Sequence, residues 1–260
     1  MNLGKGWKKD APDPRDYSAR GLLGARLGAN PLSASLEGLI KEIWDQGPTS
    51  ACVGHAFARA IQLRCAAMNT PIANPSRTAI YTAARSYERA GASTPLVDQG
   101  CFPRDAAKGI TEWGVPSESY WPFDPAHIND EPTLEELEQA SVAIVTGYYT
   151  IDTDGTDREN DVQQALAANY PVVIGVEVDP AMENYDGNGV VTAPVVAQEL
   201  GGHMLCIVGY DRTVQGTTRY RICNSWSNTW GDHGLFWADS AWLLDPGAGD
   251  LRALTCAPSR

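Results

Sequence analysis

Three residues of this chain have side chains and sequence surroundings suited to nucleophilic chemistry: Cys52, His203 and Asn224. Cys52 follows turn-forming residues and opens an apolar, alanine-rich run in DQGPTSACVGHAF. If a helix begins there, its unpaired N–H groups and its dipole favour the thiolate, the reactive form of cysteine. This segment alone leaves three interpretations open: a packed small residue, a metal ligand paired with His55, or a nucleophile.

The contexts of His203 and Asn224 favour a catalytic pair. His203 follows two glycines at the start of an apolar strand, GGHMLCIVGYD, where small neighbours let another segment or a substrate approach closely. Asn224 lies where a strand runs into the tryptophan-rich turn NSWSNTW. An asparagine there can orient an imidazole shielded by Trp226, and a Cys–His couple requires such a third group. Taken singly, a core histidine and core aromatic residues under a loop stay open as interpretations.

A metal site is not favoured by the spacing of the candidate ligands. Cys52 and His55 supply two ligands, and zinc sites usually add two more as a closely spaced pair. CxxC and HxxxH are both absent. We therefore expect neither a metal nor a cofactor, and place His55 on a helix, pointing into a cleft wall or solvent.

Composition and charge argue against several classes of protein. The 260 residues carry 20 Lys plus Arg against 32 Asp plus Glu, a formal net charge of −12. An acidic chain without a basic cluster is a poor nucleic-acid binder and is repelled by anionic membranes. No apolar run approaches the about 18 residues of a membrane helix, and the N-terminal MNLGKGWKKDAPDPRDY lacks the apolar region of a secretory signal.

The cysteine pattern bears on the compartment. Six scattered cysteines without CxxC favour a reduced protein of the cytoplasm, bacterial or in a phage-infected host cell. Their even number leaves the oxidised alternative open.

Hydrophobic periodicity places helices in the first half and strands in the second. The predicted helices cover residues 50–68, 77–90, 104–113, 133–140 and 157–169, and the predicted strands are PVVIGVEV, GGHMLCIVGYD, TRYRICNSW and GLFWAD. This order indicates an α+β fold whose two halves form a cleft. Residues 1–35 are predicted to be an irregular leading segment, and 246–260 a surface-wrapping tail.

Taken together, these segments resemble the papain family of cysteine peptidases. DQGPTSACVGHAF resembles the family element QG.C.SCWAF, GGHMLCIVGYD resembles HAV..VGYG, and NSWSNTWGDHGLFW resembles NSWG..WG..GY. GCFPRDAAKGITEWGVPSESYWPFD resembles a fourth element, GG.P..A....GI..E..YPY, and the likeness runs from about residue 12 to residue 242. It implies that Cys52 is the nucleophile, His203 the base, Asn224 the orienting amide, Gln46 an oxyanion donor and Trp226 the shield.

The resemblance also implies a fold and an activity. The fold would be a single domain, residues 1–260, with a helical lobe over about 44–130 and an antiparallel, β-barrel-like lobe over about 140–245. The activity would be that of a thiol protease: an endopeptidase that works through a Cys52–His203 thiolate–imidazolium pair and an acyl-enzyme. Its partners would be a polypeptide substrate and a protein inhibitor, with no nucleic acid or membrane.

Six residues are implied in substrate binding. The substrate would lie extended along Gly100 and Cys101. Pro103 and Met204 would line the pocket for the residue two before the cleaved bond, with an apolar preference. Gly202 and Trp226 complete the implied set.

The chain departs from the family pattern at several points. Val53 replaces the usual Trp, Thr49 removes one family disulfide, and Cys101 replaces a glycine, which would narrow or redirect substrate binding. The sequence shows no inhibitory propeptide of the usual kind before the domain, so we expect that it was removed or that the enzyme is made without one, and residues 1–35 are a candidate for part of that role.

Two rival functions stay open on the sequence. One is another acyl transfer on the same scaffold, by a peptidoglycan-peptide hydrolase, an isopeptidase or a transamidase. The other is a non-catalytic binding homologue.

Overall fold

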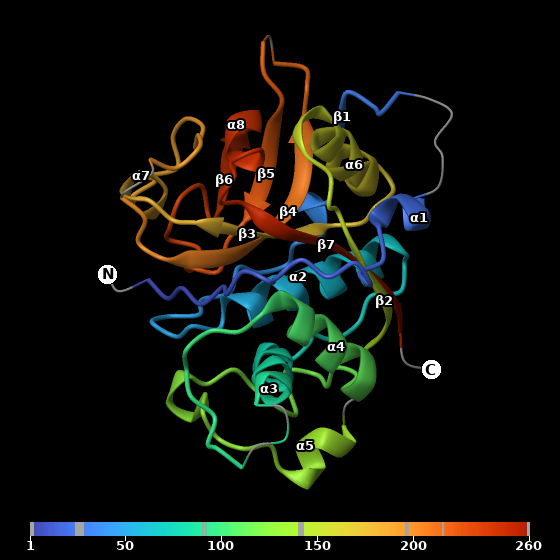
Figure 1. The fold of residues 1–260 in the computed structure, drawn as a ribbon, viewed down its shortest axis with the longest axis vertical. Helices are drawn as coiled ribbons and strands as arrows, with labels where there is room; N and C mark the ends of the chain where they lie inside the picture. Colours follow the sequence, from blue (N-terminus) through green and yellow to red (C-terminus); the bar gives the residue numbers. More distant parts are fainter. Residues whose placement is uncertain are drawn as a thin grey trace.

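The computed structural model describes residues 3–23, 29–89, 91, 93–139, 143–195, 198–214 and 216–258. It has two lobes, with α3, α4 and α5 at one end, the β-sheet at the other, and α2 between them (Figure 1). This is the α+β two-lobe arrangement that the sequence predicts, with helices leading and strands following in the chain.

Local sequence signals explain where the helices of the first lobe begin and end. They are α2 (Cys52–Ala67), α3 (Arg77–Glu88), α4 (Pro103–Trp113) and the short α5 (Leu134–Glu138). Ser76 caps α3 through its hydroxyl, Pro103 occupies the first turn of α4, and Gly114 ends α4 with φ of 73°. The alanine-rich α2 is buried along most of its length, because small side chains let α3 and the sheet approach it closely.

An antiparallel sheet dominates the second lobe. Its strands are β1 (Ser33–Ser35), β2 (Ala143–Thr150), β3 (Val172–Glu177), β4 (Gly202–Asp211), β5 (Arg219–Cys223), β6 (Leu235–Asp239) and β7 (Gly249–Pro258). The main order is β2-β7-β3-β4-β5-β6, and β1 pairs with β4. The remaining short elements are α1 (Ala19–Leu23), η1 (Glu37–Leu39), η2 (Pro125–His127), α6 (Gly155–Ala167), α7 (Pro180–Glu183) and α8 (Ser240–Leu243).

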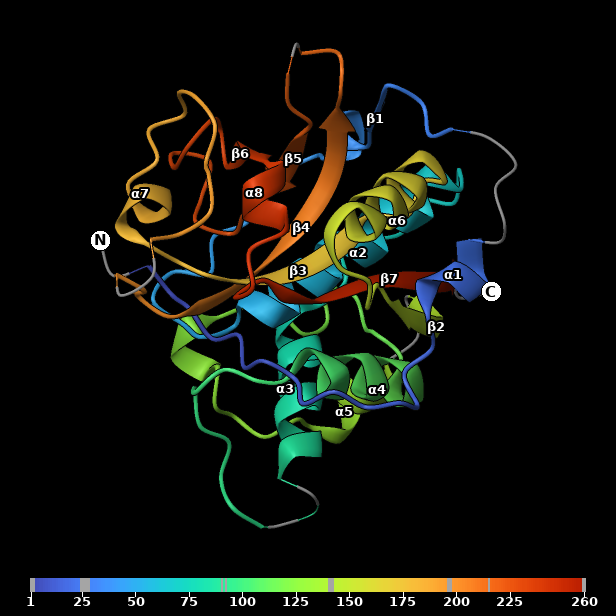
Figure 2. The same cartoon turned by 45° about the horizontal axis from the view of Figure 1, so that its top comes forward.

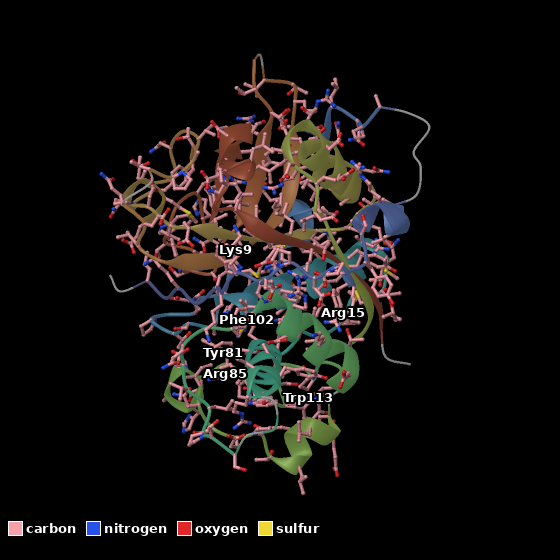
Figure 3. The ribbon with its side chains drawn as sticks, viewed as in Figure 1. Lys9, Arg15, Tyr81, Arg85, Phe102 and Trp113 are labelled. Atoms are coloured by element: carbon pink, nitrogen blue, oxygen red, sulfur yellow. The ribbon has the colours of Figure 1, made fainter. Side chains whose placement is uncertain are left out.

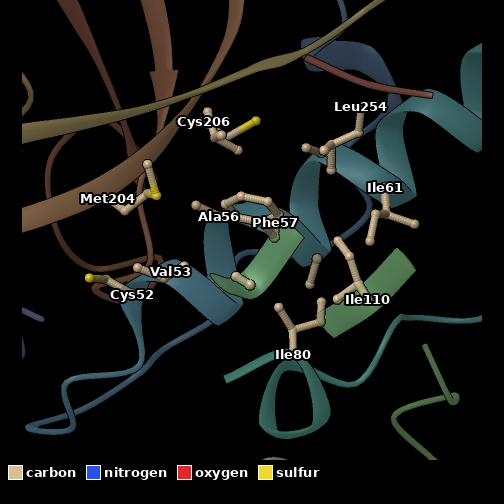
Figure 4. Packing of buried hydrophobic residues seen from close by; sticks show 14 of the residues in the cluster. Cys52, Val53, Ala56, Phe57, Ile61, Ile80, Ile110, Met204, Cys206 and Leu254 are labelled. Atoms are coloured by element: carbon tan, nitrogen blue, oxygen red, sulfur yellow. The ribbon is translucent and has the colours of Figure 1, made fainter. Parts of the chain in front are cut away.

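Two hydrophobic clusters hold these elements together. The first lies between α2, α3, α4 and the sheet, and Figure 4 shows Phe57 and Ile61 of α2 packed among Ile80, Ile110 and Leu254. The second includes buried side chains of α6, α8 and the strands β3 to β7. The sheet is therefore covered on both faces, which explains why β3 and β4 read as continuous apolar runs.

Both ends of the chain differ from the sequence prediction. Residues 1–35 were expected to be irregular, yet α1 and β1 fall within them, and residues 3–10 run between the sheet and the helices α3 and α4 (Figures 1 and 2). The predicted tail, 246–260, is wrong for residues 249–258, which form β7 inside the sheet. Strand β2 was also missed, and the predicted helix ends at residues 90 and 140 lie outside the described residues.

Candidate active site

Cys52 is the first residue of α2, where no side chain caps the helix N-terminus. Its side chain is completely buried, and the backbone groups of Met204 and Gly6 face the sulfur. Burial raises the pKa of the thiol to about 12, against the smaller opposing effect of those backbone groups. In this state the sulfur is therefore a neutral thiol.

His203, the second residue of β4, is held by Asn224. Its Nε2 donates a hydrogen bond of 2.8 Å to Asn224 Oδ1, which also accepts the backbone N–H of Ser225. The other ring nitrogen, Nδ1, is buried and has no hydrogen-bond partner within the described residues. Burial lowers the pKa of His203 to about 4, and the hydrogen bond to Asn224 offsets only part of that shift.

Trp226 covers the histidine. Its indole stacks on the imidazole with ring centroids 4.4 Å apart and planes 19° apart. Trp230 meets Trp226 edge-on at 5.3 Å, so a second indole supports the first. This packing keeps water from one face of His203, as the sequence pattern indicates.

Gln46 is connected to the His203–Asn224 pair through Ser225. The Ser225 hydroxyl donates a hydrogen bond of 2.6 Å to Gln46 Oε1, and Gln46 Nε2 donates to the backbone oxygen of Thr49 at 2.8 Å. Gln46 is completely buried. Its amide is thus fixed from both ends, which leaves its second N–H as the free donor.

Residues 3–8 lie directly across this group of side chains. The backbone N–H groups of Gly6 and Trp7 both donate to the Gly202 oxygen, at 2.9 and 3.0 Å. The Gly4 oxygen accepts the Trp226 indole N–H at 3.0 Å. A Cβ at Gly4 would lie 2.8 Å from Gln46 Nε2 and one at Gly6 would lie 2.1 Å from the Ser50 oxygen, so only glycine fits there.

The opposite wall of the cleft pairs with the same segment. Cys101 N–H donates to the Gly6 oxygen at 3.0 Å, and Lys8 N–H donates to the Cys101 oxygen at 3.2 Å. Gly100, with φ of 77°, donates its N–H to the hydroxyl of Tyr81 on α3 (Figure 3). A Cβ at Gly100 would lie 2.0 Å from the Gly6 oxygen, so glycine is needed there both for backbone conformation and for space.

The structure brings most of the predicted site residues together. His203, Asn224, Gln46 and Trp226 are joined by the contacts above, and Gly202 and Cys101 join them through Gly6. The Cys52 sulfur faces the backbone of Gly6 and Met204, and among the described residues no hydrogen bond joins it to His203. Met204 is buried beside Cys52 across from α2 (Figure 4), and Pro103 is buried at the start of α4. That Pro103 and Met204 form a substrate pocket stays a prediction.

His55 lies on α2 as expected, and of the two expected orientations the structure excludes the one toward solvent. It is buried, with Nδ1 2.9 Å from the Ala51 oxygen and its ring edge-on to Phe123, so it does not face solvent.

Three contributors were missed by sequence reasoning. Ser225, which links Gln46 to Asn224, stands inside the quoted NSW motif, so its position beside Asn224 was an available signal. Trp7 and Asp250 come from opposite ends of the chain, and no local pattern marks either of them as part of a cleft.

Among the described residues, no cluster of His, Cys, Asp and Glu has the geometry of a metal site. Over those same residues no helix has both the length and the apolar character of a membrane span. An open groove of about 340 Å³ begins at Leu3 and Trp226 and continues along 183–186 and 229–231.

A cysteine at a helix N-terminus, whose sulfur faces the backbone next to a histidine held by asparagine, is the arrangement expected of a cysteine peptidase. The comparison with known families agrees. Residues 33–241 match the Papain family cysteine protease, and the chain belongs to that family. It is a cysteine-type endopeptidase, a hydrolase of peptide bonds.

Individual relatives support the assignment. The peptidase C1-like protein L477 of Acanthamoeba polyphaga mimivirus is 30% identical over 257 residues, covering 89% of this chain and 79% of that protein. A cathepsin L-like proteinase of Fasciola hepatica is 26% identical over 200 residues, 76% of this chain and 56% of its own length.

Solved structures share the fold. Xylellain, a cysteine protease from Xylella fastidiosa, superposes with a TM-score of 0.79 at 26% identity, over 98% of this chain and 96% of that one. The bromelain protease from Ananas comosus, solved with the E64 inhibitor, has a TM-score of 0.66 at 17% identity, over 88% of this chain and 99% of that one, and it supports the fold alone.

Proposed function

We propose that Cys52 and His203 carry the peptidase reaction and that residues 3–10 of the same chain restrain it. One observation carries the proposal: Cys52 opens α2 with its sulfur facing the backbone of Met204, the residue after His203, whose Nε2 is held by Asn224. The second ring nitrogen, Nδ1, is buried without a partner in the described part of the chain. A buried polar atom left unpaired costs free energy, and a role in proton transfer accounts for it.

In the proposed reaction the Cys52 thiol gives its proton to Nδ1 of His203, and the helix N-terminus stabilises the thiolate. The sulfur bonds to the substrate carbonyl carbon, and the π electrons move onto the oxygen. The N–H groups of Gln46 Nε2 and the Cys52 backbone donate to that oxygen, a contribution of about 2.7–4 kcal/mol for each donor in comparable enzymes.

The acyl-enzyme then forms and breaks down by proton transfers through the same ring. The C–N bond breaks as His203 gives its proton to the leaving amine. His203 next takes a proton from water, whose oxygen attacks the thioester carbon and releases the Cys52 sulfur with a proton. Asn224 keeps the ring in position throughout, and Ser225 keeps the Gln46 amide in position.

The restraint follows from what covers the site. Cys52 and His203 are both completely buried, and residues 3–8 occupy the space that a substrate backbone needs. Burial also holds the pair in its neutral form, because it raises the thiol pKa and lowers the imidazole pKa. Removal of the segment would rehydrate both groups and permit the ion pair.

The segment binds as an inhibitor and escapes cleavage itself. Its Gly4 carbonyl is bound by Trp226 and its Gly6 carbonyl by Cys101, so neither points toward the proposed oxyanion donors. A carbonyl held away from those donors loses the stabilisation of the tetrahedral intermediate.

We also propose a cytoplasmic or otherwise reducing location. All six cysteines are free thiols, and Cys65 and Cys256 keep their sulfurs 3.5 Å apart without a bond. Free, buried thiols of this kind persist in reducing compartments.

The test is active-site labelling with E64 together with hydrolysis of unfolded casein, in the full chain and in Trp7→Ala. We expect slow labelling of the wild type, faster labelling of Trp7→Ala, and none in Cys52→Ala. Trp113→Ala, at the end of α4 away from the site, is the matched tryptophan control. If His203→Ala in the Trp7→Ala background reacted with iodoacetamide at acidic pH as fast as its parent, the ion-pair mechanism would be rejected.

A further inference from the structure

The side chain of Trp7 fills a pocket at the centre of the cleft. The indole is 6% exposed, and its own backbone N–H is bound to the Gly202 oxygen, one residue from His203. The pocket therefore opens where a bound peptide would lie, not at a remote surface.

Two glycines on neighbouring strands, Gly175 and Gly202, make room for the indole. Gly175 of β3 pairs with Gly249 of β7, and Gly202 lies nearby on β4. A Cβ at Gly175 would lie 2.1 Å from Trp7 Cε2, and one at Gly202 would lie 2.9 Å from Trp7 Cε3. The sheet is therefore hollow here because these residues have no side chains.

A carboxylate closes the pocket at its far end. Asp250 Oδ2 accepts the Trp7 indole N–H at 2.8 Å and the Asp10 backbone N–H at 2.9 Å. Asp250 has φ of 52°, the left-handed region. Both donors belong to the N-terminal segment, so its departure leaves a buried acceptor without either of them.

The negative charge of Asp250 is compensated by a neighbouring arginine, Arg252. The Arg252 guanidinium is 1% exposed and lies 3.6 Å from Asp250 Oδ1, while its shortest ion pair, 2.6 Å, is with Asp10. Once Asp10 leaves with the segment, Asp250 becomes the nearest fixed carboxylate to Arg252. The pocket end then offers a hydrogen-bond acceptor without net negative charge, which favours a neutral donor over a cation.

We propose that this pocket is a substrate side-chain pocket that selects tryptophan, with Gly175 supplying the space and Asp250 the specific hydrogen bond. The inference rests on the proposed function, because it treats the Trp7 site as part of the peptidase cleft. In this interpretation Trp7 occupies the pocket as a substrate tryptophan would. The sequence predicts that the substrate pocket prefers an apolar side chain because of Met204, and the hydrogen bond to Asp250 adds one polar requirement to that preference.

The first test measures binding and needs no catalysis. Fluorescein-labelled peptides LGKGXKKD, with X as Trp, Leu, Arg or Ala, are titrated by anisotropy into full chain carrying Trp7→Ala and Cys52→Ala. We expect the Trp peptide to bind at least about tenfold more tightly than the others, since both apolar area and a buried hydrogen bond are lost without it. Equal binding, or tighter binding of the Arg peptide, would overturn the pocket assignment.

The second test asks whether the same pocket selects substrates. Internally quenched peptides with one Trp, Leu, Arg or Ala scanned through each position are hydrolysed by full chain Trp7→Ala. We expect Trp to raise kcat/KM at one position, and Gly175→Ala in that background to remove this preference while Ala-containing peptides are still cleaved. Gly38→Ala, at a position with open space around an added Cβ, is the matched control.

The outcomes separate the two claims. Hydrolysis without a Trp preference, or a preference that survives Gly175→Ala, would overturn the inference and leave the peptidase intact. Trp-selective binding without hydrolysis or E64 labelling of any variant would instead reject the proposed catalytic roles.

Discussion

The two ends of the chain meet beside the active site, yet they are held in different ways. Residues 3–8 touch the rest of the molecule through backbone hydrogen bonds, the Trp7 side chain and two ion pairs, Lys5–Glu183 and Lys8–Glu88, each 2.6 Å long. Strand β7 pairs with β2 on one side and β3 on the other, and Leu251 and Leu254 belong to different hydrophobic clusters. The first end puts Trp7 into the first hydrophobic cluster, whereas β7 puts side chains into both clusters and pairs with two strands.

The contacts between the two ends decide how firmly the N-terminal end is held. Asp10 pairs with the buried Arg252 at 2.6 Å, and Trp7 hydrogen-bonds Asp250. Strand β7 therefore supplies, through Asp250 and Arg252, the side chains that hold residues 3–10 in place. This difference suggests that stability and restraint can be changed separately.

The largest effects, of similar size, are expected at two buried side chains, and the first of these lies on β7. Leu254→Ala should lower the free energy of unfolding by about 2–5 kcal/mol, because Leu254 is 1% exposed and packs against α2. Urea unfolding followed by circular dichroism measures it. The 79% exposed Leu134 provides the control, Leu134→Ala, and equal stability of the two variants would contradict the interior position of β7.

The second of these effects concerns the N-terminal end. Trp7→Ala should weaken docking of the segment by about 3–5 kcal/mol, the usual loss for a buried tryptophan, and raise the E64 labelling rate by about a hundredfold or more. Mass spectrometry of the E64-labelled fraction over time measures the change in labelling rate. An unchanged rate with an intact fold would mean that the segment is not what limits access to Cys52.

A smaller effect should follow pH through Asp10, which faces Arg252, Arg104 and Asp250, while Asp16 pairs with the same two arginines. Burial raises the pKa of this carboxyl from 3.8 to about 6, more than the arginines lower it. A raised pKa means that the docked state binds the proton more tightly, so docking is strongest below pH 3.8 and weakens as pH rises through about 6. Solvent exposure of the segment should accordingly increase over that window.

Hydrogen exchange of residues 3–8, measured from about pH 4 to about pH 7 and corrected for the intrinsic rate, is the readout. Asp10→Asn, which cannot titrate, should flatten the profile. A profile of the same shape in both proteins would assign the pH dependence to another group.

The smallest effect is expected at a residue that touches neither chain end. Ser225→Ala removes the hydrogen bond to Gln46 Oε1 and should lower kcat/KM about threefold to tenfold, the range for one hydrogen bond. Measured in the Trp7→Ala background, KM and the E64 labelling of the resting enzyme should stay the same. A change in labelling alone would show that Ser225 acts on the segment instead.

The sequence carried much of the fold because the relevant signals are local. Alanine spacing and the apolar face of 50–68 predicted α2, and the apolar run after Gly202 predicted β4. Strand β7 was missed because Asp250, Arg252 and Thr255 break its apolar pattern. Arg252 is nevertheless buried, because its charge is compensated by ion pairs with Asp10 and Asp250. Local propensity and periodicity cannot predict that Arg252 is buried, because its partner Asp10 lies near the other end of the chain.

What the sequence by itself determined is the set of reactive groups: the cysteine at a helix start, the histidine after two glycines, the asparagine in its tryptophan-rich turn, and the order in which they occur. The tertiary structure alone decided that Trp7 lies against Gly175 and Asp250 and that residues 3–8 cover Cys52. The reason is physical. Helix starts and strands depend on neighbours a few residues apart, whereas occupation of the cleft depends on contacts between residues up to 243 positions apart, which only packing of the whole chain selects.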